Sequence, residues 1–576
     1  MTSLRNKIKD LNLTQELIAK GIGLLQQPRV VYKQGEAHDA PPAIVVDEDK
    51  NHVALRATYE AERSIAKHIA RLLAASVAAL DVDTDKLWTG CGFTPDQLQR
   101  DAVDLVVRSQ VVIITGGPGT GKTTIVQTAR KALSRAGAIL QMCPTGKAAQ
   151  RLTEQTGAPS TTIHRALGYA PGGEPVHAAD NPWDAGVVII DEASMIDVHL
   201  MAKTLAAIPT GARVVIIGDV DQLPSCDAGA VLRDLIDSGV APTVKLEKIY
   251  RQASESRIPY VARGINHGQL PDDLEGIGTD FRFIERGTDY ESCKDEEERQ
   301  RRMETRRQDI INLVLLAVTK GIPEQKGIPA EDCQVLAPQK SKGVGVERLN
   351  FELQKTLNPQ RDEKLDIYIG GGCGYVARTG DKVMHVENNY ALMVFNGEVG
   401  RVVDANRSGV DMDKWPAART SEEAEREARA KARGEFDFDM GADFDGGGDR
   451  DLKKKYLLVV EFNNGTRQVA YTAGEARELV LGYAVTIHKS QGSQFPANIM
   501  VCDWEHQFML TRQLVYTGVT RAEKYMLVIG QRKSLQRASE NTRGAKRRTE
   551  LQELLKTTTA DTGSSLDLLR TAGDDS

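Results

Sequence analysis

The stretch Val111-Val112-Ile113-Ile114-Thr115-Gly116-Gly117-Pro118-Gly119-Thr120-Gly121-Lys122-Thr123 decides the fold of the region around it. Its four leading apolar residues predict a buried strand, and residues 124–136 have a helix-compatible composition. A glycine-rich turn between a strand and a helix is typical of a P-loop, because glycines let successive backbone N–H groups converge on one anion. Lys122 would reach the β- and γ-phosphates, and Thr123 would hold Mg²⁺. The stretch therefore predicts an α/β domain that binds a nucleoside triphosphate.

A second apolar run, Val187–Ile190, ends in two carboxylates, Asp191 and Glu192. Asp191 is suited to holding Mg²⁺ through its water shell, and Glu192 to orienting and deprotonating an attacking water. A phosphotransferase would exclude that water, so the adjacent glutamate favours hydrolysis. The alternative is an N-cap pair on a surface helix, which the P-loop upstream makes the weaker interpretation.

The next predicted strand, Val214–Ile217, runs into the loop Gly218–Ser225, which contains Gln222. A glutamine at the carboxyl end of a strand, beside the phosphate site, can sense the γ-phosphate. Gln222 could equally be a loop residue without such a role, and its position alone leaves both interpretations open.

Composition narrows the class of protein. The chain has 576 residues, too many for one core, and its hydrophobic (41%) and charged (27%) fractions are those of a globular protein. No apolar run is long enough for a membrane span, and residues 1–15 do not read as a secretory signal. Seven scattered cysteines without a Cys-x-x-Cys pair argue against zinc and disulfides, and predict a cytoplasmic location.

The net charge of −6 is concentrated in residues 434–451, which hold seven acidic side chains and one arginine. The remaining residues are balanced, so total charge neither supports nor excludes nucleic acid. An EF-hand that began at Asp443 would place Lys454 where the bidentate glutamate belongs, so a calcium motif is rejected. An inert solubilising loop is the favoured interpretation, and a partner-binding or DNA-mimicking loop is the alternative.

Strand and helix patterns divide the chain into parts. Residues 59–75 have helical apolar spacing, whereas alternating strands and helices follow from Phe93 onward. The sequence around Asn464-Gly465 predicts a β-hairpin, and the charged stretch 293–307 predicts a solvated helix face. The expected parts are a mainly helical N-terminal domain (1–92), a first α/β lobe (93–245), a second α/β lobe (246–395 and 473–536), a β insertion (396–472) with a mobile loop (407–452), and a polar C-terminal tail that frays (537–576).

An ordered series of motifs identifies a family. The series resembles superfamily 1 helicases of the RecD-like subgroup, which includes the phage Dda helicase, over roughly residues 93–530. The segments that carry the resemblance are TPDQLQRDAV (94–103), GGPGTGKTT (116–124), CPTGKAAQRL (143–152), TIHRAL (162–167), DEAS (191–194), GDVDQLPS (218–225), YRQ (250–252), GYAVTIHKSQG (482–492) and YTGVTRA (516–522). The resemblance implies two RecA-like P-loop NTPase lobes with parallel sheets and an SH3-like β insertion.

The resemblance also assigns roles to residues. Gln99, with Gln97 as the alternative, would contact adenine. Arg251 and Arg521 would be arginine fingers, whose guanidinium groups neutralise charge on the transferred phosphoryl group. The residues implied in ATP binding are Gln99, Gly117, Pro118, Gly119, Thr120, Gly121, Lys122, Thr123 and Thr124, and those implied in DNA binding are Thr145, Gly146, Lys147, His164, Thr486, His488, Lys489, Ser490 and Gln491.

The function implied is an ATP- and Mg²⁺-dependent DNA helicase that moves 5′ to 3′ on single-stranded DNA and acts at single-strand/duplex junctions. A short hairpin at 168–185 would be the wedge, and replication, recombination or repair proteins would be partners. The alternatives are a motor subunit of a multi-subunit exonuclease and a non-unwinding, ATP-switched DNA-binding protein.

Overall fold

The computed structural model consists of two compact units. The first comprises Met1–Pro144, Leu152–Lys248 and Ala545–Ser576, and the second comprises Thr145–Arg151 and Ile249–Gly544. The residues that the structure describes are 22, 25–27, 29–33, 36–40, 42–47, 52–75, 77, 80–89, 94–169, 173–248, 256–274, 280–287, 293, 295–361, 365–370, 375–389, 392, 394–410, 456–462, 467–545 and 547–560.

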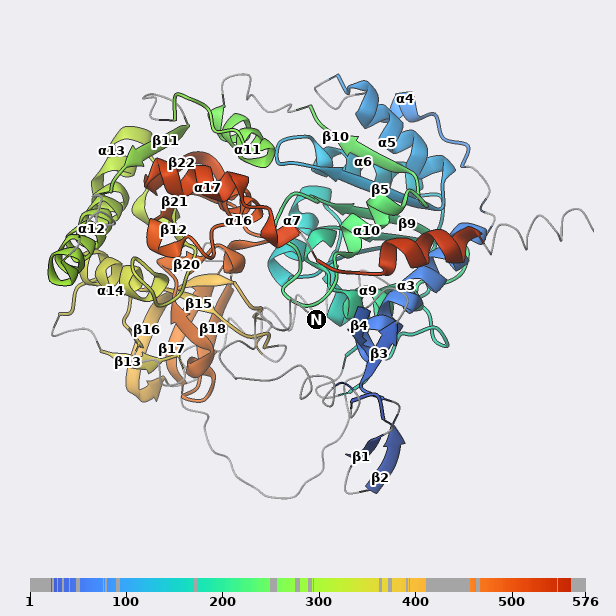
Figure 1. Cartoon of the computed structure of the whole chain (residues 1–576), viewed down its shortest axis with the longest axis horizontal. Coiled ribbons are helices and arrows are strands. Elements are labelled where there is room, and N and C mark those ends of the chain that lie inside the picture. The colour runs from blue at the N-terminus through green and yellow to red at the C-terminus, as the bar shows by residue number, and fades with distance from the viewer. Residues whose placement is uncertain are drawn as a thin grey trace, which may run out of the picture. The chain divides into compact units, whose positions relative to one another are not determined.

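The first unit is built on a parallel sheet of six strands in the order β10-β5-β9-β8-β6-β7 (Figure 1). Every residue of the three strands at its centre is buried, as expected for parallel strands with helices on both faces. The strands are β5 (Val111–Gly116), β6 (Ile139–Cys143), β7 (Thr161–Thr162), β8 (Val187–Ile190), β9 (Arg213–Gly218) and β10 (Thr243–Leu246), and the helices are α5 (Gln97–Arg108), α6 (Lys122–Leu133), α8 (Ile163–Ala166), α9 (Val198–Ala207) and α10 (Val231–Ser238). Helix α7 (Gly146–Thr156) is divided between the units, because its residues up to Arg151 group with the second unit.

The N-terminal region contains strands as well as the expected helix. The sequence predicted a mainly helical domain, and the four strands differ from that expectation, because short two-stranded ribbons have too few residues for a clear periodicity. Helix α3 packs on α9, and it buries Ile65, Ile69 and Leu72 in the core of the first unit. The elements are β1 (Arg29–Lys33), β2 (Glu36–Ala40), β3 (Ile44–Asp47), β4 (His52–Leu55), α3 (Arg56–Ala74) and α4 (Thr84–Leu87).

The C-terminal segment also belongs to the first unit. Residues 551–560 are helical, and Leu551 and Leu555 are buried in the same core as α3. Each buried leucine contributes about 1.5–3 kcal/mol. The tail was predicted to fray from residue 537, but the described part of it does not, because these leucines are spaced four apart on one helix face.

The second unit is built on a parallel sheet of five strands in the order β11-β22-β21-β12-β20. The strands are β11 (Phe281–Glu285), β12 (Cys333–Ala337), β20 (Ala484–Thr486), β21 (Phe495–Cys502) and β22 (Ala522–Gly530), and the helices are α11 (Arg257–His267), α12 (Glu296–Leu316), α13 (Ile322–Lys326), α14 (Val346–Leu357), α16 (Arg512–Val519) and α17 (Arg532–Glu540).

An antiparallel sheet in the order β18-β17-β16-β15-β19 is inserted into the second unit. The predicted hairpin is confirmed, because β17 pairs with β18. The insertion is wider than 396–472, since β15 and β19 close it by pairing residues about a hundred positions apart in sequence. Its strands are β15 (Lys382–His385), β16 (Val399–Val410), β17 (Tyr456–Phe462), β18 (Arg467–Tyr471) and β19 (Leu479–Leu481), and a separate ribbon is formed by β13 (Ile367–Ile369) and β14 (Tyr375–Ala377).

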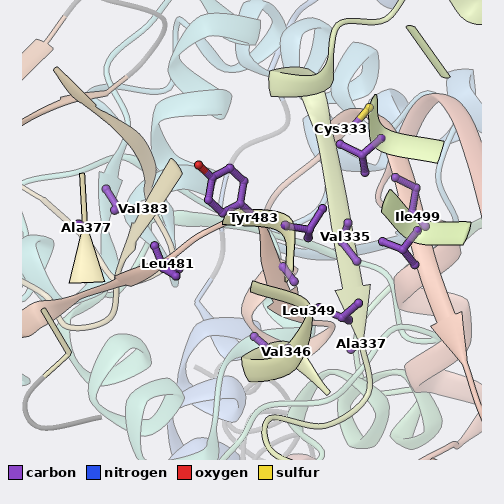
Figure 2. Close-up of a cluster of buried hydrophobic side chains, with 14 of the residues drawn as sticks. Cys333, Val335, Ala337, Val346, Leu349, Ala377, Val383, Leu481, Tyr483 and Ile499 are labelled. Atoms are coloured by element: carbon purple, nitrogen blue, oxygen red, sulfur yellow. The ribbon is translucent and has the colours of Figure 1, made fainter. Parts of the chain in front are cut away.

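The insertion and the parallel sheet share one hydrophobic core. Figure 2 shows Val335 and Ala337 of β12 in the same cluster as Val383 of β15 and Leu481 of β19. Tyr483 lies between the two sets and donates a hydrogen bond to Asp381 Oδ1 over 2.8 Å. Of the predicted mobile loop 407–452, residues 407–410 end β16, and the rest, with the acidic stretch, lies outside the described residues.

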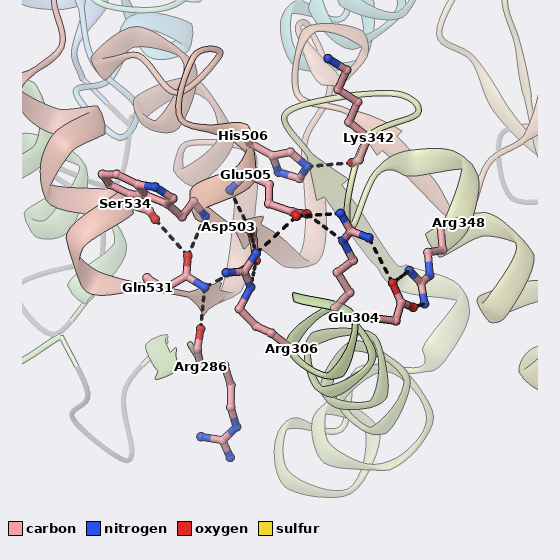
Figure 3. Close-up of polar contacts among 12 residues, drawn as sticks. Arg286, Glu304, Arg306, Lys342, Arg348, Asp503, Glu505, His506, Gln531 and Ser534 are labelled. Atoms are coloured by element: carbon pink, nitrogen blue, oxygen red, sulfur yellow. Dashed lines mark hydrogen bonds and ion pairs between the residues drawn. The ribbon is translucent and has the colours of Figure 1, made fainter. Parts of the chain in front are cut away.

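Helix α12 carries the predicted charge cluster, and only part of it is a solvated face. Arg302 forms an exposed pair with Glu298, one turn earlier. Arg306, however, is 2% exposed and pairs with the buried Asp503 at 3.1 Å, just after β21 (Figure 3). Arg307 likewise donates to Glu505 over 2.7 Å. The end of the cluster therefore fixes α12 to the second sheet.

Among the described residues, no helix is both long and apolar enough to cross a membrane.

Candidate active site

The P-loop connects β5 to α6 in the first unit, as predicted. Gly119 and Gly121 have φ angles of 76° and 86°, a left-handed conformation that favours glycine. Thr120 closes the turn by donating its hydroxyl to Gly117 O over 2.8 Å. No side chain caps the start of α6 at Gly121, so the first N–H groups of this helix suit an anionic phosphate. These features fit a nucleoside triphosphate.

Lys122 lies at the first position of α6, and its ammonium group donates to the carbonyl oxygens of Gly116 and Gly117, the latter at 3.0 Å. The hydroxyl of Thr123 donates to Gln155 Oε1 over 3.4 Å. Thr124 accepts a hydrogen bond from Thr128 through its carbonyl, within the helix. The two predicted phosphate and metal ligands therefore begin the same helix.

Gln99 and its alternative, Gln97, have different environments. Gln99 is 1% exposed, and its side chain accepts from Asp96 N in a capping box that begins α5. Its amide nitrogen contacts the P-loop, where it donates to Thr120 O over 3.5 Å. Gln97 instead donates to Asp101 on the exposed side of the helix. The environment favours Gln99 as the glutamine that belongs to the nucleotide site.

Asp191 and Glu192 follow β8 directly. Glu192 has φ 53° and ψ 38°, and it is the one non-glycine residue with positive φ in the described part of the chain. A left-handed glutamate costs roughly 1–2 kcal/mol. Its N–H donates to Asp191 Oδ1 over 2.8 Å, which stabilises the turn. Strain of this kind is concentrated at functional sites, where it directs a side chain.

A buried thiol lies near the two carboxylates at this edge of the sheet. Cys143 ends β6, the strand beside β8, and burial raises its thiol pKa well above the usual range, with Asp191 and Glu192 adding to the effect. The thiol therefore stays protonated. Gly218 ends β9, and a Cβ there would lie 2.8 Å from Leu232 Cδ2 and 3.1 Å from Ser194 N, a close approach that favours glycine. The carboxyl ends of β8 and β9 are thus in contact.

Sequence reasoning singled out Gln222 but missed Asp219. Asp219 is 1% exposed, and burial raises its pKa although the Lys122 ammonium opposes the shift. Gln222 Nε2 donates to Asp219 Oδ2 over 3.1 Å. Asp221 N donates to Asp219 Oδ1 over 3.1 Å. The signal that could have identified Asp219 is its position directly after a buried strand of the P-loop sheet.

Of the two predicted arginine fingers, the structure describes Arg521, which belongs to the second unit. Arg521 is 2% exposed, and its guanidinium donates to Thr517 O and to Ser493 O, each over 3.1 Å. Its side chain is therefore held inside its own unit by main-chain carbonyls. Arg251 lies outside the described residues.

The residues predicted to bind DNA are found in both units. Within the second unit, Lys147 lies over the Phe495 ring, with its nitrogen 4.7 Å from the ring centre, and burial lowers its pKa to about 8. Thr145 caps the first turn of α7 by accepting from Ala148 N, and it lies beside Gly492. Gly146, which lies between Thr145 and Lys147 in the sequence, is the first residue of α7.

The second group of residues predicted to bind DNA follows β20. Thr486 accepts from Lys489 N, and the Lys489 ammonium donates to Asn396 Oδ1 over 2.6 Å. Ser490 is buried, and its hydroxyl donates to Ile487 O over 2.7 Å. Burial lowers the pKa of His488, and Gln491 is 7% exposed.

His164 lies in α8 of the first unit. Its ring centre is 5.6 Å from that of Tyr169, and burial lowers its pKa. The predicted wedge hairpin follows it. Residues 170–172 lie outside the described residues, and 168–169 and 173–185 contain turns without a strand, so the wedge stays a prediction.

Three family models match successive parts of the chain. An AAA domain model matches residues 94–285, the model of the ATP-dependent RecD-like DNA helicase SH3 domain matches 349–413, and the UvrD-like helicase C-terminal domain model matches 481–529. The SH3 match begins before β15, which agrees with an insertion wider than the predicted one.

Characterised relatives cover most of the chain. The ATP-dependent RecD2 DNA helicase of Deinococcus radiodurans is 33% identical over 450 residues, which are 78% of this chain and 51% of that protein. The RecBCD enzyme subunit RecD of Mycolicibacterium smegmatis is 27% identical over 521 residues, which are 86% of this chain and 80% of that protein. This chain thus spans about half the length of the first relative.

A crystal structure of Pif1 helicase from Candida albicans, 19% identical, covers 81% of this chain and all of that one, with a TM-score of 0.43. The matched parts and their order are those of RecD-like helicases, which this chain resembles, and its fold consists of two RecA-like parallel-sheet lobes with an SH3-like insertion.

Proposed function

We propose that this chain is an ATP-dependent DNA helicase that translocates 5′ to 3′ on single-stranded DNA. The observation that carries the proposal is the gathering of Lys122, Asp191-Glu192 and Asp219-Gln222 after three adjacent parallel strands, β5, β8 and β9. The similarity to a protein named as an ATP-dependent DNA helicase supports ATP-dependent helicase activity on DNA. The direction is an expectation from the RecD-like resemblance.

The residues present fit ATP and Mg²⁺. The left-handed glycines and the uncapped start of α6 suit phosphate oxygens, and the hydroxyl of Thr123 and the carboxylate of Asp191 suit a hard cation. Mg²⁺, when bound, supplies neutralisation of phosphate charge. Lys122 adds a further positive charge at the same helix start.

Glu192 is the candidate base. Its strained backbone directs the side chain away from the regular path of β8, and its carboxylate would accept the proton of the attacking water. Gln222, bonded to the buried Asp219, would sense the γ-phosphate. Arg521 would have to exchange its carbonyl partners for the phosphate to act as a finger, and this exchange would couple hydrolysis to a rearrangement around Thr517 and Ser493.

Two measurements test the proposal. ATP hydrolysis should be strongly stimulated by single-stranded DNA, and duplexes with a 5′ tail should be unwound in preference to those with a 3′ tail. Slow hydrolysis that ignores DNA would favour the ATP-switched binding protein. Preference for the 3′ tail would contradict the direction but not the activity.

The second candidate is a motor subunit of a multi-subunit exonuclease, because several relatives are named as RecBCD subunits. It predicts that the purified chain unwinds poorly alone and that a partner restores unwinding. Helicase activity of the isolated chain would favour the first proposal.

A further inference from the structure

The guanidinium group of Arg547 holds the downstream half of the loop that follows β9. It donates to the Ser225 hydroxyl at 3.1 Å, to Gly229 O at 2.7 Å, and to the carbonyl oxygens of Ser225 and Asp227. Ser225 itself is 5% exposed, and its hydroxyl donates to Asp227 O over 3.0 Å. One side chain thus joins three main-chain carbonyls of a single loop, a geometry that the planar fork of arginine suits.

The loop held in this way carries Gln222. Its upstream end is fixed by Asp219, which accepts from Asp221 N and Gln222 Nε2, and by Val220 N, which donates to Thr115 Oγ1 over 3.3 Å. Arg547 fixes the other end, beginning at Ser225. Gln222 therefore lies midway between two anchors, each three residues away. A change at Ser225 is therefore expected to alter where the Gln222 amide can lie.

The segment that carries Arg547 is itself attached to the first unit at several points. Glu550 N donates to Glu62 Oε2 of α3 over 3.0 Å, and Gln552 Nε2 donates to Asp237 O of α10 over 2.9 Å. Figure 1 shows this C-terminal helix, in red, beside α3 and α10. The second unit ends at Gly544, three residues before Arg547. The segment 545–560, called the strap below, therefore follows the second unit directly in the chain and contacts the Gln222 loop through Arg547.

We propose that Arg547 is a positioning residue for Gln222, and that the strap 545–560 holds the γ-phosphate-sensing loop in its working conformation. The inference rests on the proposed function, since it assigns Gln222 a role in ATP hydrolysis. It adds a residue outside every motif of the nucleotide site.

A double-mutant cycle of Arg547→Ala and Gln222→Ala tests the inference, with Arg548→Ala as the matched control. Arg548 is the exposed neighbour in the same segment. DNA-stimulated kcat and KM for ATP are measured for all variants at a temperature where thermal scans show them folded. R547A should lower kcat about tenfold to a hundredfold with KM within about twofold, because a loop displaced by about 1 Å misplaces the amide. R548A should equal the wild type.

The cycle separates positioning from general support. In the Q222A background, R547A should cause no further loss of kcat, because the residue through which it acts is absent. Hydrogen exchange of residues 219–229 should accelerate in R547A and not in R548A. An equal loss of kcat from R547A in both backgrounds, or unchanged exchange, would overturn the inference. An inactive wild type would instead refute the proposed function, which the other results presuppose.

Discussion

Replacement of Glu62 by glutamine should strengthen the docking of the C-terminal strap at pH 8 and leave it unchanged near pH 4.5. Glu62 lies on α3, is 5% exposed, and accepts a hydrogen bond from Glu550 N. Burial raises its pKa from 4.5 to about 7; the Glu550 N–H opposes the shift, and the charges of Asp234 and Glu550 add to it. A glutamine keeps the acceptor oxygen without the charge.

The sign follows from proton binding. A carboxyl whose pKa is raised in the docked state binds more protons there than after release, so rising pH weakens docking between pH 4.5 and about 7. The difference between a pKa of 4.5 and one of about 7 corresponds to about 3 kcal/mol. This value is an upper limit, because the packing of α3 on α9 should keep Glu62 partly buried after the strap leaves. Asp234, with its pKa raised by burial to about 6, adds a smaller penalty over a lower range.

Hydrogen exchange of residues 551–560 provides the assay. At pH 8, the opening free energy in E62Q should exceed that of the wild type by up to about 3 kcal/mol, which is about 100-fold slower exchange after correction for intrinsic rates. Glu553→Gln, an exposed position in the same helix, is the control and should change little. His52 Nδ1 lies 3.4 Å from Glu550 Oε1, so a contact from β4 reaches the same strap residue.

The reasoning would be refuted if wild-type and E62Q straps showed the same pH dependence, or if E62Q docked more weakly at pH 8. The first result would place the titration at another group, and the second would mean that the glutamate charge stabilises docking.

Three further results are expected. Glu192→Gln should bind a fluorescent ATP analogue normally and hydrolyse ATP at least about 100-fold more slowly, since a general base contributes that much or more; normal turnover would exclude Glu192 as the base. Gly121→Ala should weaken nucleotide binding, because it places a left-handed alanine with its Cβ 2.4 Å from Gln99 Nε2. The double variant Gly121→Ala, Gln99→Ala should recover only the part of the binding affinity that is lost through the clash with Gln99, as measured by calorimetry. Full recovery of the affinity would contradict a cost from the left-handed backbone. Leu555→Ala should weaken the docking of the strap by about 2–5 kcal/mol, because it removes a buried side chain. The loss should be measured as faster proteolytic cleavage after residue 544. Protection equal to that of the wild type would contradict the core position of Leu555.

Local sequence predicted the parts of this protein that depend on short-range chemistry. The apolar runs before the P-loop and before Asp191 gave strands β5 and β8 because parallel strands buried on both faces need continuous apolar residues. The hairpin around Asn464-Gly465 followed from its turn residues, and β17 pairs with β18 as expected.

Tertiary structure alone decided the rest. Asp219 is a site candidate because the fold buries it beside Lys122, and Arg521 is enclosed by carbonyls of its own unit. The closure of β15 with β19 joins strands that are distant in sequence, and no local pattern specifies such a pairing. In the sequence, Arg547 is one arginine of a polar tail, and only the folded chain brings it to the loop after β9, where it donates to Gly229 O. Burial and long-range contacts are properties of the folded chain, so these features could not be read from neighbouring residues.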